Sequence, residues 1–130
     1  LASIMMGTAV ANLKGLNNPS LSAAAMYRSY LKEVRAKAIA RTAAYMVVPN
    51  SSDGLTASFS DRCSDSFVSF VGDPKLDFQL PSGASFLNTS WTICITSRGL
   101  ASNTVTVTIL GNDGDSKQVE LMLGGATREL

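Results

Sequence analysis

The sequence predicts an α+β domain in which a long N-terminal α-helix packs on an antiparallel β-sheet head. Apolar residues follow a helical spacing in the first 48 residues and alternate with polar residues after Val48. The chain has 130 residues, which suits one domain with one core. A half-buried sheet needs a second layer, so the helix must cover it. We therefore expect residues 1–48 as helix and 49–130 as β-rich head, forming one domain together.

The helical pattern is clearest from Ser20 onward. Its expected packing face repeats close to i, i+4, i+7 and comprises Met26, Tyr27, Tyr30, Leu31, Val34 and Ala38, with Tyr45 extending the stripe. Pro19 disfavours helical geometry at the residue before it, which predicts a kink or break near residues 17–19. Pro19 could equally be the first residue of a restarted helix capped by Asn18.

A basic stripe runs beside this face. Arg28, Lys32 and Arg35 again follow i, i+4, i+7. Residues 1–48 carry six basic residues against Glu33 alone, whereas residues 49–130 carry five basic and nine acidic residues. No aromatic residues interleave with the stripe as they do in single-strand binders, which favours a solvated or partner-facing flank over contact with nucleic acid or anionic lipid.

Alternation predicts the strands of the head. The expected strands cover residues 55–60, 67–71, 76–80, 91–96, 104–109 and 119–123. Gly111–Asp115 has the Asp-Gly chemistry of a tight hairpin turn, which we favour over a calcium loop because the spacing fails the EF-hand order.

The composition argues against an enzyme. The chain has no His, which excludes Ser-His and Cys-His catalysis and imidazole zinc sites. Asp61, Asp65, Asp73 and Asp77 are interpreted as solvated loop carboxylates rather than an acid/base pair. Gly124-Gly125-Ala126 follows a strand without the Lys-Ser/Thr of a phosphate loop. We expect no catalytic residues, no metal, no cofactor and no small-molecule substrate.

Two cysteines leave one possible intramolecular pair. Cys63 and Cys94 either form a disulfide or remain two free thiols. We favour the disulfide because both residues occupy polar positions, where unpaired thiols of a secreted protein would be exposed.

Membrane spanning is not predicted for the sequence as it stands. It contains no window of 18 consecutive apolar residues. Leu1–Met6 nevertheless looks like the tail of a longer apolar segment that precedes residue 1.

Three segments resemble the type IV pilins and type II secretion pseudopilins. Leu1-Ala2-Ser3-Ile4 resembles the end of their apolar N-terminal segment. Residues 21–25 and 33–41 look like the helix of the H-type minor pseudopilins and related minor pilins. Residues 95–102 and 119–128 resemble that group's paired closing strands.

The resemblance implies a structural subunit and no enzyme. Such subunits are anchored in the bacterial inner membrane by an apolar helix, here missing, with the head in the periplasm. They are processed by a prepilin peptidase and assemble with other pilin or pseudopilin subunits into a pilus or pseudopilus. The helix face named above would then pack on the sheet or on neighbouring subunits, and Arg28, Lys32 and Arg35 would contact acidic neighbours.

The sequence leaves two other functional classes as alternatives. An extracellular binding module, adhesin-like or a DNA-uptake pilin, would hold a ligand on the head and would show a pocket or a basic groove there. A secreted hydrolase is a more distant alternative. An assembly subunit should instead expose apolar residues on its helix.

Overall fold

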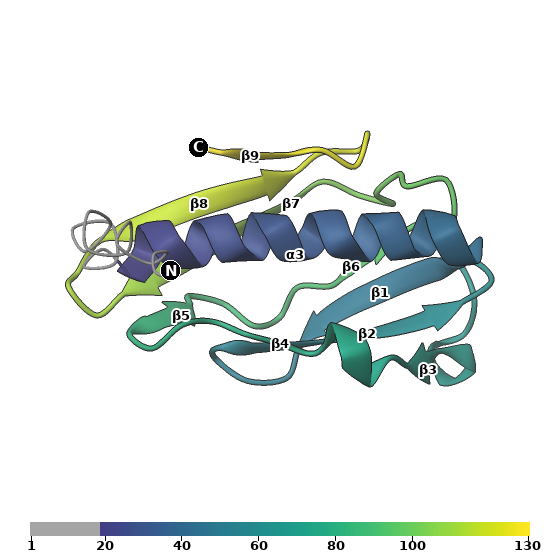
Figure 1. The fold of residues 1–130 in the computed structure, drawn as a ribbon, viewed down its shortest axis with the longest axis horizontal. Coiled ribbons are helices and arrows are strands. Elements are labelled where there is room, and N and C mark those ends of the chain that lie inside the picture. Colours follow the sequence, from purple (N-terminus) through teal and green to yellow (C-terminus); the bar gives the residue numbers. More distant parts are fainter. Residues whose placement is uncertain (1–18) are drawn as a thin grey trace, which may run out of the picture.

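The computed structural model describes residues 19–130 and has an α+β fold, as predicted. Helix α3 (Pro19–Arg41) lies along two antiparallel sheets, with β8 and β9 above it, β7 passing behind it and β1–β4 below it in Figure 1. Pro19 is the first helical residue, a position where the missing N–H costs no helical hydrogen bond. The helix expected over residues 1–18 lies outside the described residues, as do residues 17 and 18 of the kink or break expected near 17–19.

The helix ends at Arg41, so the prediction of helix through Val48 is wrong for the last residues. Thr42 has a φ of 53°, and the Ala43 N–H donates to the Ala38 carbonyl, 3.1 Å between N and O, which closes the helix end. Strand β1 (Ala44–Pro49) follows at once. Tyr45, which fits the helical stripe in the sequence, is instead fully buried on this strand.

The first sheet contains the strands β2 (Gly54–Ser60), β3 (Val71–Gly72), β4 (Phe78–Gln79) and β6 (Ile93–Ile95) around β1. Its order is β3-β2-β1-β6, with β4 also pairing with β2. Strand β1 is therefore central, with β2 along its whole length on one side and β6 on the other.

The second sheet contains β5 (Ala84–Phe86), β7 (Val105–Gly111), β8 (Ser116–Leu121) and β9 (Thr127–Glu129), in the order β5-β7-β8-β9. The predicted hairpin turn joins β7 to β8: the Gly111 N–H donates to the Asp115 carbonyl, and Gly114 has a φ of 87°. Alternation did not predict the six-residue strand β1 or the three-residue strands β5 and β9.

The apolar run at residues 67–71 does not form the predicted strand. Phe67–Ser69 is a 3₁₀ turn, and only Val71–Gly72 pairs with β2. Local hydrogen bonds from the Ser69 and Phe70 N–H groups to Ser66 and Phe67 replace the expected ladder. A second 3₁₀ turn (Pro74–Leu76) follows, with Asp73 as its N-cap.

One face of α3 supplies the helical half of the core. Tyr27, Tyr30, Leu31, Val34 and Ala38 are buried there, against residues of both sheets such as Val47, Leu55, Ile93, Ile109 and Val119. Tyr27 meets Phe86 and Trp91 edge to face, and Tyr30 stacks on Phe78 with 4.7 Å between ring centroids. Met26 is the exception in the expected face: it is 43% exposed, because it lies on the flank of the helix.

A buried carboxylate joins the end of α3 to the first sheet. Asp73 Oδ2 accepts from Tyr45 Oη at 2.9 Å and lies 3.1 Å from Lys37 Nζ and 3.8 Å from Arg41 Nη1. Burial acts to raise the pKa of Asp73, but the hydrogen bonds from Lys37 and Tyr45 outweigh it and the pKa is lowered. The expectation that Asp73 is a solvated loop carboxylate is therefore wrong.

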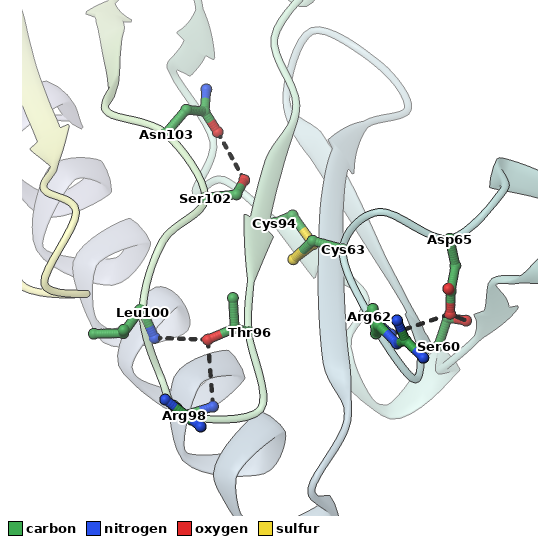
Figure 2. The surroundings of a disulfide bond; sticks show 10 residues. All are labelled: Ser60, Arg62, Cys63, Asp65, Cys94, Thr96, Arg98, Leu100, Ser102 and Asn103. Carbon is green, nitrogen blue, oxygen red and sulfur yellow. Dashed lines mark hydrogen bonds between the residues drawn. A yellow bond between two sulfur atoms is a disulfide. The ribbon is translucent and has the colours of Figure 1, made fainter.

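The predicted disulfide between Cys63 and Cys94 is present and fastens the loop after β2 to β6 (Figure 2). The same loop is closed by Asp65, whose carboxylate accepts from Ser60 Oγ at 2.6 Å and from the Arg62 N–H at 3.1 Å. Both hydrogen bonds lower the pKa of Asp65.

Asp73→Asn tests the buried network. At pH 7 we expect the free energy of unfolding to fall by about 1–3 kcal/mol, because a charged acceptor of several hydrogen bonds is lost. Since the folded pKa of Asp73 lies below its unfolded value, the wild type loses this contribution as the pH falls below about 4. Urea unfolding at pH 7, 5 and 3 should show that the free energies of unfolding of the wild type and of Asp73→Asn become more similar as the pH falls. Exposed Asp61→Asn is the control, and a variant difference that stays constant down to pH 3 would contradict the network.

Replacing both cysteines by serine tests the disulfide. Closing a loop of 31 residues contributes about 2–4 kcal/mol on the chain-entropy account. The free energy of unfolding of C63S/C94S should therefore be lower by about that amount, and its urea midpoint should fall. Reductant should shift the unfolding curve of the wild type toward that of the variant and leave the variant unchanged. A wild type that reductant does not move would show that the bond adds no stability.

Candidate functional site

The solvent side of α3 carries small residues. Ala25, Ser29, Ala36 and Ala40 are all exposed and share the side of the helix opposite its buried face. We call these four residues the crest. Short side chains let a second backbone approach a helix closely, so the crest is suited to packing against another helix.

The predicted basic stripe borders the crest on one side. Arg28, Lys32 and Arg35 line one groove together with Ile39 and with residues 125–127 of the closing hairpin. Arg28 Nε donates to Thr127 Oγ1 at 3.3 Å, and Arg35 Nε donates to the Gly99 carbonyl at 2.8 Å. The structure therefore brings the three cations to one groove and anchors two of them on the head. We call Arg28, Lys32 and Arg35 the basic flank.

Two glycines make room for Arg35. Gly99 and Gly125 have φ values of 83° and 88°. A Cβ on Gly125 would collide with the Gly99 carbonyl and lie 2.7 Å from Arg35 Nε, and one on Gly99 would lie 2.8 Å from Ile39 Cδ1. Both positions thus favour glycine for conformation, and Gly125 requires it for space as well. The residues alone indicated a strand end at 124–126 and gave no sign that this hairpin supports Arg35.

The opposite flank of the helix is acidic. Glu33 and Asp77 line a groove together with Met26, Tyr30, Leu76 and Phe78, and Lys75 also lines it. We call Glu33 and Asp77 the acidic flank. The sequence did not predict it, because only the fold of the 3₁₀ turn before β4 brings Asp77 beside the helix.

The charges of both flanks are left without ionic partners inside the chain. In residues 19–130 the ion pairs join Asp73 to Lys37 and Arg41, and Glu120 to Arg128. Within that range, none joins a residue of the basic flank or of the acidic flank to an opposite charge. Both flanks therefore present unneutralised charge at the surface.

The head exposes one cluster of large apolar residues on the segment that the disulfide tethers. Phe67 is 73% exposed, Val68 87% and Val71 58%. These residues lie on the 3₁₀ turn and on the edge strand β3. The sequence predicts a strand over residues 67–71 and gives no sign of this exposed apolar surface.

The described residues show no metal centre. Among residues 19–130, no group of three or more Cys, Asp or Glu side chains is placed to hold a metal ion. Asp65 closes its own loop and Asp73 belongs to the buried network.

Hydropathy identifies no membrane-crossing helix in the described part of the chain.

Comparison with known proteins gives structural matches only. No protein-family model matches the sequence, and no curated protein matches it significantly. The type IV minor pilin FimU of Pseudomonas aeruginosa, in one crystal form, superposes with a TM-score of 0.58 at 15% identity, over 84% of this chain and 86% of that chain. A second crystal form of FimU gives a TM-score of 0.56 at 18% identity, over 84% of this chain and 90% of that one.

A minor pseudopilin matches over a similar share of the chain. EpsH of the Vibrio cholerae type 2 secretion system gives a TM-score of 0.58 at 14% identity, over 87% of this chain and 97% of that chain. Both neighbours belong to the group that the resemblance names, and the described residues have the fold of type IV minor pilins and minor pseudopilins.

Proposed function

We propose that this protein is a minor pilin or pseudopilin, a structural subunit that acts in assembly of a type IV pilus or type II secretion pseudopilus and performs no catalysis. The pilin-like fold supports the class. The observation that carries the assembly role is the solvent side of α3. Exposed alanine also stabilises a helix by its propensity, but an exposed row of small residues flanked by exposed Met26 and Ile39 is what close packing against another helix requires.

The proposal includes the place where the subunit works. An apolar segment preceding Leu1 would anchor the full-length protein in the bacterial inner membrane, with the head in the periplasm, until the subunit enters the filament. Its partners would be other pilin or pseudopilin subunits. The disulfide supports an oxidising compartment such as the periplasm, because thiols are kept reduced in the cytosol.

An extracellular binding module is the second candidate, favoured by the cluster of Phe67, Val68 and Val71. Three neighbouring exposed apolar residues on a tethered segment are typical of a contact surface. This cluster lies on the head, where the binding hypothesis places its ligand. The two roles make different demands on the helix, since a ligand on the head does not need the crest.

Ala36→Glu tests the assembly role. The gene is expressed in its own cell with all upstream sequence in place, and the subunit is quantified in sheared filaments with an antibody against the head. We expect about a tenfold or larger loss from the filament fraction, because the new carboxylate would have to be buried between packed helices. The level of the protein in whole cells should not change, since Ala36 is exposed in the folded chain.

Ser82→Glu is the matched control, because Ser82 is an exposed small residue on the head and not on the helix. It should enter filaments at the wild-type level. Normal incorporation of the Ala36→Glu protein would contradict packing through the crest. A wild-type protein absent from filaments would contradict the assembly role and favour the binding module.

A further inference from the structure

We propose that the basic flank of one copy docks on the acidic flank of a second copy, so that the chain associates side to side in an open, head-to-tail array. This inference rests on the proposed function, since it names a contact within the assembly. The contact joins Arg28, Lys32 and Arg35 of one copy to Glu33 and Asp77 of the next.

Charge complementarity identifies the occupant of each groove. The basic flank presents three cations and the acidic flank two carboxylates, and within residues 19–130 the ion pairs leave all five unused. The surface of this protein therefore carries both halves of the contact. Matched potentials accelerate encounter and fix register, while docking like flank on like flank would be repulsive.

The basic flank is already ordered before any partner arrives. Arg28 is held by Thr127 through Nε and, at 3.4 Å, through Nη2 to the backbone carbonyl. Arg35 is held by the Gly99 carbonyl within the space that Gly99 and Gly125 leave. Fixing these long side chains in advance lowers the entropy that docking would cost.

Each groove also offers an apolar residue beside its charges. Ile39, 48% exposed, lines the basic groove, and Met26 lines the acidic one. Burying such residues around an ion pair excludes water and strengthens the electrostatic attraction. The basic groove is lined by Arg28, Lys32 and Arg35. The acidic groove is lined by Glu33 and Asp77 together with Lys75, so the two grooves still carry net charges of opposite sign.

The placement of the flanks on the helix sets the kind of assembly. The two flanks lie on either side of the crest, so a contact between them sets the helices of two copies side by side. The contact is heterologous, since different surfaces meet, and it leaves one flank free at each end of the array. Such a contact grows into a ring if its rotation closes and into a helical filament if it does not.

Two charge-reversed variants test this contact. The first, R28E/K32E, makes both flanks acidic and leaves Arg35 in its place between the glycines. The second, E33K/D77K, makes both flanks basic. Sedimentation equilibrium of the purified chain at low salt should show self-association of the wild type that weakens in 0.5 M salt. Each variant alone should associate at least about tenfold more weakly, because its two flanks repel.

The decisive sample is an equimolar mixture of the two variants. It contains an intact acidic flank on one chain and an intact basic flank on the other, so association should return to within about threefold of the wild type. Thermal unfolding of each variant at high salt shows that it is folded. Lys117→Glu, at a half-buried position near the start of β8, is the matched single reversal outside both flanks and should leave association unchanged.

A mixture that stays as weakly associated as its components would overturn the proposal, as would variants that each associate like the wild type. Phosphatidylglycerol vesicles and duplex DNA serve as separate probes. If the wild type binds either one through Arg28 and Lys32 and does not self-associate, the basic flank serves another anion and the proposal is wrong. If the flank contact fails while the protein still enters filaments, only this contact is lost and the proposed function stands.

Discussion

Burial of one face of α3 is the constraint on which the rest of the structure depends. The two sheets do not share a strand, and the helix is the element that contacts strands of both. Leu31 and Val34 are fully buried in this contact, and each is worth about 1.5–3 kcal/mol by the apolar surface it removes from water. Because that face is committed to the sheets, the crest and the two flanks are left facing outward in a fixed orientation.

The parts of the fold that follow from periodicity could be predicted from the sequence. Tyr27, Leu31 and Val34 repeat at the helical period and are buried together, and the alternation of Val105, Val107 and Ile109 marks a half-buried strand. The helix end could not be predicted in this way. Tyr45 fits the helical spacing by coincidence, and the bend at Thr42 requires a positive φ with no glycine to announce it. These residues form a strand because strand geometry lets Tyr45 and Val47 both be buried in the core.

Sequence patterns predict the basic flank of the candidate site but not its acidic flank. Arg28, Lys32 and Arg35 lie on one helix, where spacing alone places them on one side. Glu33 and Asp77 meet only because the chain returns to the helix after β3, and no local pattern encodes that return. The burial of Asp73 could not be predicted for a similar reason: its partners Lys37 and Tyr45 are far from it in the sequence. The Asp-Pro step after β3 did offer one local signal, since Asp is a favoured cap and Pro a favoured first residue of a turn.

The short link between α3 and β1 has a mechanical consequence. Only Thr42 and Ala43 separate the last helical residue from the central strand of the first sheet, and Lys37 and Arg41 bind Asp73 across the same corner. In the filament proposed above, tension would reach the subunit through its helix and would pass directly into β1, because no slack loop separates the two elements. Pulling on β1 would shear it between β2 and β6, so that many of its hydrogen bonds are loaded at once. The Cys63–Cys94 disulfide ties the loop after β2 to β6, so the two strands beside β1 would share the force.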